Sequence, residues 1–330
     1  MPEVSLAELR AHVAAVRGPQ FRLPARFAAA SLDDYRPDPA YPGQAAALMQ
    51  VRAMLASEPP RRRLFRRAPD LTPRGLYLDG PPGVGKTHLM AAAFNAAPEP
   101  KLFVTFDELS AAAGTLGMSG LSRLLASQRL VCIDEIDLRD PANIMLLVSL
   151  LRAMLSGSPR IIATANADPL GSSAKGMTGD DFRREVGEIA SAFTIQRFDG
   201  VDRRLALAQV RRGRLVGEPR TLRVAWDQLL QFLTDIHPMY DAAWLDLVDI
   251  IEVDRVGALD DSDQALRFVR FIDRVYDRDV ALVAEGPIPA PDAILRSLIG
   301  DRRFVLHVAR CRSRLVELLG VSVAEERAAD

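Results

Sequence analysis

The chain has 330 residues, of which 48% are hydrophobic and 26% are charged, and its formal net charge at pH 7 is -1. This length allows two domains with their own cores, and the near-neutral charge excludes a protein that binds polyanions over its whole surface. The two cysteines, Cys132 and Cys311, lack the spacing of a disulfide framework or a zinc site. No apolar run approaches the roughly 18 residues that span a bilayer, and the first residues lack the features of a signal peptide. We therefore expect a cytoplasmic protein.

Residues 1–70 are expected to form an N-terminal region. Ser5 and Glu8 have the spacing of a capping box, which predicts a short helix. Residues 19–43 are rich in proline and aromatic side chains, which predicts an extended arm that packs on the next domain, and a helix is expected over 44–57. The connector that follows carries five arginines from Arg61 to Arg67. We interpret it as a solvated loop, and the alternative is a contact with phosphate or anionic lipid at a membrane surface.

Short apolar runs alternate with helical segments over residues 71–200. Five runs have the character of buried strands: GLYL, KLFVTF, RLVCID, RIIATA and FTIQRF. The segments between them carry apolar residues at spacings of three and four, as helices do. This alternation predicts an α/β fold with a parallel sheet that is flanked by helices on both faces.

Over residues 201–330 the alternation loosens. We expect a mostly helical, lid-like C-terminal region with helices over 225–235, over 263–277 and near the end of the chain. Strands are expected in LVDIIEV and VALVA.

GPPGVGKT satisfies the GxxxxGK[ST] pattern of a phosphate-binding loop. It follows a predicted strand and opens a predicted helix, so the backbone N–H groups there are expected to cradle the phosphates of ATP. Lys86, one of three lysines in the chain, is expected to reach the terminal phosphates as a compact charge that arginine cannot replace. Thr87 is expected to place its hydroxyl on Mg²⁺, and His88 to pack rather than to catalyse. The expected nucleotide-binding residues are Gly80, Pro81, Pro82, Gly83, Val84, Gly85, Lys86, Thr87 and His88.

The strand in RLVCIDEID ends in two carboxylates, Asp134 and Glu135. Adjacent carboxylates at the end of an apolar strand are unfavourable unless a cation offsets them. We expect Asp134 to hold the Mg²⁺ shell and Glu135 to orient and polarise the attacking water. Cys132, on the same strand, is expected to pack in the core.

The strand in RIIATAN ends at Asn166. We interpret this polar side chain, at a strand tip beside the two carboxylates, as a sensor of the γ-phosphate, and the alternative is an ordinary loop residue. Asp140 and Pro141 have the pattern of an N-cap and first turn for the helix before this strand.

GPPGVGKT, VCIDEID and ATAN, in this order, resemble the two Walker motifs and the first sensor of an AAA+ ATPase. Four further stretches resemble the ZapE/AFG-like family of these ATPases: YRPDPAYPGQ, DEIDLRDPAN, DFRREV…DGVDRR and ALRFVRFIDRVYDRDVAL. The resemblance extends from about residue 21 to 291. It implies a ring-forming ATP hydrolase, a hexamer by expectation. It also implies relatives that are associated with bacterial cell division or with protein quality control at the mitochondrial inner membrane.

The chain departs from the family pattern at three places. FDELSAAAGTLG replaces a helix that bears phenylalanine and histidine in many relatives, TANADPLG stands in place of TSNRPP, and VDRR in place of VDYR. The first of these changes a surface that is expected to contact the partner. The family's specific partners are therefore not carried over to this chain.

A neighbouring subunit's arginine usually completes each site in ring ATPases. In DDFRREVGEIASAF the apolar residues form one narrow helical stripe, and Arg184 lies about 160° from it at 100° per residue. We assign Arg184 as the finger that acts in trans, with Arg183 as the substitute. The alternative is a surface ion pair between Arg184 and Glu188.

A second arginine stripe, Arg267, Arg270 and Arg274, recurs beside the apolar face of the helix expected over 264–277. We assign Arg267 as a second sensor that reaches the nucleotide, and a solvated basic face is the alternative.

These motifs favour an ATP-hydrolysing AAA+ machine that remodels or disassembles protein partners, with division-ring components among the candidate clients and no stable nucleic-acid complex. Two rival hypotheses stay open. The first is a nucleic-acid-handling ATPase of the helicase-loader kind, whose loops GPPGVGKTHL also resembles. The net charge and the lack of basic strands with interleaved aromatic residues weigh against it. The second is a non-motor adaptor that binds ATP tightly but turns over negligibly.

Overall fold

The structure, a computed structural model, describes residues 2–16, 21–57, 75–81, 83–136, 141–155, 159–165, 187, 191–200, 218–237, 240–301 and 304–319. The chain divides into two compact units. The five-stranded unit comprises the described parts of Phe21–Leu23 and Phe27–Arg204. The three-stranded unit comprises the described parts of Met1–Gln20, Pro24–Arg26 and Leu205–Asp330. Residues 1–70 are therefore shared between the two units.

The five-stranded unit is built on one parallel sheet with the strand order β2-β3-β4-β1-β5. Its strands are β1 (Gly75–Asp79), β2 (Lys101–Thr105), β3 (Leu130–Ile136), β4 (Arg160–Ala165) and β5 (Phe193–Arg197). Each strand coincides with one of the five apolar runs of the sequence. The predicted α/β class with a parallel sheet is confirmed.

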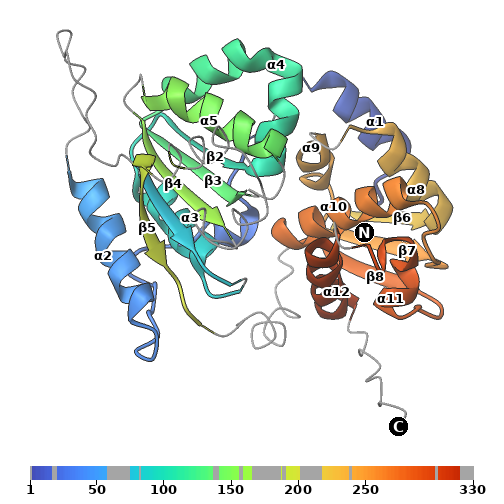
Figure 1. The fold of residues 1–330 in the computed structure, drawn as a ribbon. Coiled ribbons are helices and arrows are strands. Elements are labelled where there is room, and N and C mark those ends of the chain that lie inside the picture. The colour runs from blue at the N-terminus through green and yellow to red at the C-terminus, as the bar shows by residue number, and fades with distance from the viewer. Residues whose placement is uncertain are drawn as a thin grey trace. The chain divides into compact units, whose positions relative to one another are not determined.

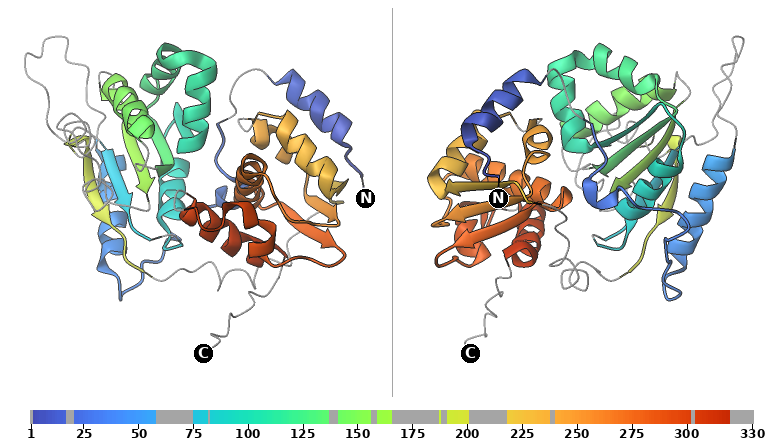
Figure 2. Two further views of the ribbon diagram at one scale, coloured as in Figure 1. Left: turned by 45° about the vertical axis from the view of Figure 1, so that its right-hand side comes forward. Right: turned by 180° about the vertical axis from the view of Figure 1, so that it is seen from behind.

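Helices cover both faces of this sheet (Figures 1 and 2). One face is covered by α4 (Phe106–Ala126) and α5 (Pro141–Leu155), and the other by α2 (Pro42–Ala56) and α3 (Lys86–Ala96). Strand β1 shows the reason, because Tyr77 belongs to the core under α4 and α5 whereas Leu76 and Leu78 belong to the core under α2 and α3. Side chains alternate across a strand, so an uninterrupted apolar strand is buried on both faces.

Helix α4 bends at Gly117, whose φ of 68° and ψ of 159° are not helical. The helix begins with a capping box, in which the Glu108 amide donates to the Thr105 hydroxyl over 3.3 Å and the Thr105 amide donates to the Glu108 carboxylate over 2.9 Å. Its start is therefore fixed by local chemistry, and its middle is broken by a glycine with positive φ.

The three-stranded unit contains a parallel sheet in the order β6-β7-β8, formed by β6 (Thr221–Ala225), β7 (Ile250–Asp254) and β8 (Ala281–Glu285). Its longer helices are α1 (Leu6–Ala15), α8 (Trp226–Asp235), α10 (Ser262–Asp277) and α12 (Val305–Leu319), with short ones at α9 (Asp241–Leu245) and α11 (Pro291–Ile294). Single 3₁₀ turns lie at Ala25–Phe27 and Arg296–Leu298. The C-terminal region is mostly helical, as predicted, but the sequence did not indicate β6.

The first helix packs within the three-stranded unit. The predicted capping box of α1 is present, with Glu8 N donating to Ser5 Oγ over 3.3 Å and Ser5 N donating to the Glu8 carboxylate over 2.7 Å. Leu9 is fully buried in the core of this unit, and Thr221 N donates to Pro2 O over 3.0 Å. The N-terminal residues therefore extend a sheet that starts more than 200 residues later in the chain.

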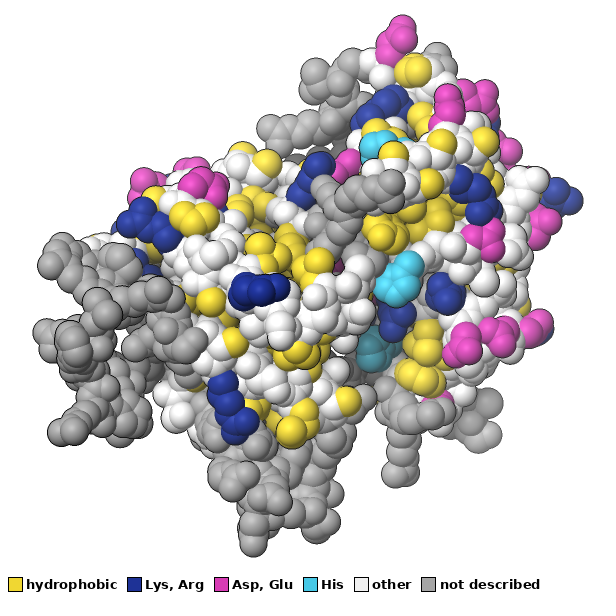
Figure 3. All heavy atoms as spheres, turned by 90° about the horizontal axis from the view of Figure 1, so that it is seen from above, with side chains coloured by type: hydrophobic (Ala, Val, Ile, Leu, Met, Phe, Trp, Pro, Cys, Tyr) yellow, Lys and Arg dark blue, Asp and Glu magenta, His cyan; other side chains and the backbone are white. Residues whose placement is uncertain are grey.

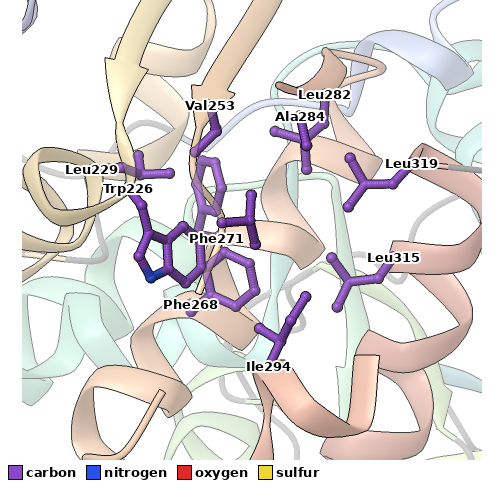
Figure 4. A pocket seen from close by; sticks show the side chains of 11 residues that line it. Trp226, Leu229, Val253, Phe268, Phe271, Leu282, Ala284, Ile294, Leu315 and Leu319 are labelled. Atoms are coloured by element: carbon purple, nitrogen blue, oxygen red, sulfur yellow. The ribbon is translucent and has the colours of Figure 1, made fainter. Parts of the chain in front are cut away.

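The core of the three-stranded unit encloses a cavity of about 10 Å³ (Figure 4). Its walls are apolar and include Trp226, Phe268, Leu282, Ile294 and Leu315. This volume is close to that of a single water site, so the cavity is too small for a nucleotide or a peptide side chain. Among the described residues, no helix is long and apolar enough to cross a bilayer.

Candidate nucleotide site

The loop that carries the phosphate-binding pattern joins β1 to α3 at the carboxyl edge of the five-stranded sheet. Lys86 is only 6% exposed, and its Nζ donates to Gly80 O and Pro81 O, each over 2.6 Å. Gly85 caps α3 with a φ of +100°, a conformation that favours glycine. The lysine ammonium therefore lies within the curve of the loop. Pro82 lies outside the described residues.

The base of this loop is packed against the segment that leaves β5. Phe198 N donates to Asp79 O over 2.6 Å, and a Cβ at Gly80 would lie 2.0 Å from Phe198 O. Only glycine allows the backbone to approach so closely. The first glycine of the pattern is therefore fixed by packing.

Gln44 of α2 ties the arm to the same segment. Its side chain is fully buried, accepts from Asp38 N over 3.0 Å and donates to Asp199 O over 3.0 Å. The stretch YRPDPAYPGQ, which carries part of the family resemblance, thus ends on the residue that joins the arm to the wall of the loop. A buried amide with both of its functions satisfied favours a single position for the arm.

The arm also packs along α3. Asn95 Nδ2 of α3 donates to the backbone carbonyls of Phe27, Ala28 and Ala30, over 3.0, 3.3 and 2.8 Å. The two N–H groups of one amide therefore serve three carbonyls, with one hydrogen shared between two of them, in a segment that has little regular structure. The arm packs on the five-stranded unit, as its composition predicted.

His88 packs between two rings of the arm. The centroid of its ring lies 6.0 Å from that of Phe27 and 5.9 Å from that of Tyr35. Desolvation by these neighbours lowers the pKa of His88, although the negative charge of Asp34 opposes the shift. The imidazole is therefore neutral at pH 7, and its contacts are those of a packing residue.

Two hydroxyls meet the carboxylate of Asp134. Thr87 Oγ1 of α3 donates to Asp134 Oδ1 over 3.0 Å, and the hydroxyl of Thr164 on β4 donates to the same oxygen. Asp134 is 6% exposed and Thr164 is 1% exposed. The end of β3 and the start of α3 are thus joined through a buried acidic group.

A β-bulge places Glu135 beside Asp134. Ile133 pairs with Ala163 and Ile136 with Ala165, so two residues of β3 lie opposite one residue of β4. Glu135 has a φ of 56°, which is uncommon for a non-glycine residue. Bulges re-aim side chains, and this one interrupts the alternation that would otherwise send the two carboxylates to opposite faces.

The oxygen donors at this site fit Mg²⁺, which prefers carboxylate and hydroxyl oxygens. Thr87 and Asp134 are the residues that would hold the ion. Among the described residues, no group of three or more His, Cys, Asp or Glu side chains could by itself hold a metal ion. Cys132, behind Asp134 on β3, is fully buried, and burial raises the pKa of its thiol well above the ordinary value. The prediction that it packs in the core is confirmed.

Several predicted site residues lie outside the described residues: Asn166, Arg183, Arg184, Asp140 and the Arg61 to Arg67 connector. Their assigned roles stay predictions. Arg267 is described in the three-stranded unit, where its Nη1 donates to Leu233 O over 3.2 Å, and its assignment as a second sensor also stays a prediction. The apolar face predicted beside it is buried and comprises Phe268, Val269, Ile272, Val275 and Tyr276.

Thr164 is the site residue that the sequence did not indicate. It stands two positions before Asn166 in ATAN, and this proximity to a polar strand tip was the one available signal.

A family model described as AFG1-like ATPase matches residues 15–247 and 242–325, which is most of the chain. The chain belongs to the AFG1-like ATPase family. It is accordingly an ATP hydrolase of the AAA+ class, as the motif resemblance implied.

Individual relatives are more distant. The chain is 26% identical to "Cell division protein ZapE" of Escherichia coli (strain K12) over 300 residues, which covers 74% of this chain and 78% of that protein. Among solved structures, the DnaI crystal structure gives a TM-score of 0.41 at 22% identity and covers 54% of this chain and 96% of that one. The DnaC helicase loader gives a TM-score of 0.39 at 19% identity, over 53% and 99% of the two chains. The fold assignment of this AFG1-like ATPase rests on its own strand order and loop geometry.

Proposed function

We propose that this AFG1-like ATPase uses ATP and Mg²⁺ to remodel or disassemble protein partners in the cytoplasm, in a process linked to bacterial cell division. The observation that carries the proposal is the convergence of Lys86, Thr87, Asp134 and Glu135 at one edge of the five-stranded sheet. Phosphoryl transfer to water uses a cation at the phosphates, oxygen ligands for Mg²⁺ and a group that orients the water. These are the ammonium of Lys86, the oxygens of Thr87 and Asp134, and the carboxylate of Glu135.

The roles of these residues follow from their chemistry. Lys86 would exchange its two carbonyl acceptors for phosphate oxygens, Thr87 and Asp134 would hold the metal, and Glu135 would orient the attacking water. The bound ion supplies neutralisation of the phosphate charge. Asn166, which follows β4 in the sequence, would sense the terminal phosphate. Arg184 of a neighbouring subunit completes the site in a ring, which we expect to be a hexamer.

The bend of α4 supports a protein client. Leu116 and Met118, on either side of Gly117, are each 38% exposed, and Met145 on the adjacent α5 is 52% exposed. No charged residue occurs between Glu108 and Arg123. Figure 3, which looks down on the face that carries α4 and α5, shows exposed hydrophobic side chains with scattered Lys and Arg side chains between them. The uncharged stretch around the bend suits an apolar polypeptide.

The link to division comes from the name of the E. coli relative, at 26% identity. Division-ring components are therefore the first clients to test. A peripheral membrane contact through the Arg61 to Arg67 connector belongs to the same proposal.

The test is capture of clients by Glu135→Gln, with and without ATP, with parallel nuclease treatment. We expect this variant to capture one or a few proteins only with ATP, regardless of nuclease, and Lys86→Ala to capture none. Met118→Asp in the Glu135→Gln background should lose the clients, whereas Met49→Asp, at a residue that is 66% exposed on α2, should keep them. Capture that disappears with nuclease would replace the proposal with nucleic-acid handling.

A further inference from the structure

We propose that Thr164 is a positioning residue that holds both carboxylates of the site in their working geometry, and this inference rests on hydrolysis of ATP at that site. Thr164 is the next-to-last residue of β4 and is 1% exposed. It does not belong to the phosphate-binding loop or to the acidic strand end. Its hydroxyl nevertheless contacts Asp134 and Glu135 together.

The first argument is the hydrogen-bond inventory of one hydroxyl. A threonine hydroxyl has one proton to donate and lone pairs that accept. Thr164 Oγ1 donates its proton to Asp134 Oδ1 and accepts the backbone N–H of Glu135 over 3.0 Å. One group thus fixes the side chain of the metal-holding residue and the backbone of the water-orienting residue.

The second argument is the bulge. Thr164 is the one β4 residue opposite Asp134 and Glu135, the two bulged residues of β3. Its hydroxyl accepts the backbone N–H of Glu135 at this point. The left-handed conformation of Glu135, with a φ of 56°, is thereby held by a side chain from the neighbouring strand.

The third argument concerns Thr87, which donates to the same Asp134 oxygen over 3.0 Å. When the hydroxyl of Thr87 turns to the metal, Asp134 loses that donor. Thr164 then remains to set the orientation of the carboxylate. Its contribution should therefore be largest in the nucleotide-bound state, which a residue that merely stabilises the fold would not show.

The experiment compares Thr164→Val, Thr164→Ala and Thr164→Ser with wild type in full-length protein. We expect kcat to fall about 10- to 100-fold in the valine and alanine variants, while the KM for ATP changes less than about threefold, and serine to restore most of the loss. The Mg²⁺ concentration that half-maximally strengthens binding of a fluorescent ADP analogue should rise several-fold without the hydroxyl. Thr221→Val is the control, because Thr221 is an equally buried threonine on β6.

If Thr164 acts through Glu135, the effects of changing the two residues should not be independent. In the Glu135→Gln background, Thr164→Val should add little further loss of turnover, because both changes remove the same function. The inference would be overturned if the losses of turnover in the double variant were fully additive. It would also be overturned if Thr164→Val kept the wild-type kcat and Mg²⁺ dependence. A third contrary result is that Thr164→Ser does not restore turnover although Thr164→Ala and Thr164→Ser have the same melting temperature. If valine does not fold, the alanine and serine pair decides. Absence of turnover in wild type would instead count against the proposed function.

Discussion

Lys86 and Asp134 show how the site holds opposite charges out of water. Lys86 donates to two loop carbonyls, and Asp134 accepts from two hydroxyls, so each charged group has partners although each is only 6% exposed. Buried charges without such partners are strongly destabilising.

Replacing Lys86 should remove nucleotide binding. Lys86→Ala is expected to weaken the binding of ATP at least about 100-fold, because the charge that neutralises the terminal phosphates is lost. Lys86→Arg should not restore this affinity. Titration of a fluorescent nucleotide measures this. Lys101→Ala is the control, since Lys101 donates to Ala97 O over 2.8 Å away from the phosphate-binding loop and should keep wild-type affinity. Wild-type affinity in Lys86→Ala would contradict the assignment.

At this scale, local spacing revealed the loop and the acidic pair, because their chemistry depends on residues that are adjacent in the chain. It did not reveal Thr164, whose contacts depend on the register of β3 against β4 and on a bulge between them. A β-branched residue inside an apolar run is typical of any strand.

Among the elements, the arm has little regular structure of its own, with one short 3₁₀ turn. Side chains of α2 and α3, among them Gln44, Arg52 and Asn95, bond to its backbone, and its apolar residues pack against the core beneath those helices. A segment without a sheet or a long helix needs side-chain partners for its backbone. Its stability should therefore respond sharply to single substitutions.

Asn95→Asp should destabilise the protein by about 2 kcal/mol, because a carboxylate would face three carbonyl oxygens that now receive hydrogen bonds. Asn95→Ala, which removes the donors without adding a charge, should lose less. Urea unfolding measures both, and limited proteolysis at Arg22 and Arg26 reports release of the arm. Equal stability of wild type and Asn95→Asp would show that the arm is held in another way.

The start of β6 is tied to β7 by an ion pair. Arg220 donates to Asp249 through its backbone amide over 2.8 Å and through Nε and Nη2 over 3.1 Å each. These bonds, with the charge of Arg220, hold the pKa of Asp249 below its ordinary value of 3.8. Both side chains are more than a third exposed, so solvent screening limits the pair to about 1 kcal/mol.

The pH dependence of Asp249→Asn has a defined sign. The folded-state pKa is lowered, so the stabilising contribution is complete above pH 3.8 and is lost as the pH falls through the folded value. The free energy of unfolding should therefore be larger for wild type than for the variant at pH 7 and pH 5, and the difference should shrink below pH 3.8. Asp254→Asn is the control, because its partner Arg255 is 79% exposed. A constant difference down to pH 2 would rule out this role.

The strands of the five-stranded unit could be predicted because they are buried on both faces and are therefore continuous apolar runs. TLRVA, which forms β6, was missed because Arg223 interrupts a run of only five residues, which then shows no clear period. The strand is defined by its pairing with β7, and the sequence pattern does not indicate that pairing.

At the scale of the whole molecule, the place of the N-terminal residues in the three-stranded unit could not be read from the order of the sequence. The residues before α1 bond to Thr221 at the start of β6, more than 200 residues later in the chain, and no local sequence pattern predicts such a contact. The ring that we propose is a further property of the whole molecule, because it would bring residues of two subunits to one site.

Mixing two inactive variants tests the trans role of Arg184. Glu135→Gln lacks the water-orienting carboxylate, and Arg184→Ala lacks the finger, so neither should hydrolyse ATP alone. Random mixing in a ring puts an intact Glu135 beside an intact neighbouring Arg184 at about a quarter of the sites, and turnover should rise toward that fraction of wild type. No recovery would place the arginine in its own subunit's site, and Arg183→Ala in the same mixture tests the substitute.

The most direct test of the account compares ATP turnover with ATP affinity in wild type and in Glu135→Gln, in the presence of Mg²⁺. We predict that wild type hydrolyses ATP and that the variant binds ATP within about threefold of wild type while its turnover falls at least about 100-fold. Normal turnover in Glu135→Gln would contradict the role of the acidic strand end. Tight binding without turnover in wild type would make the protein an ATP-gated adaptor.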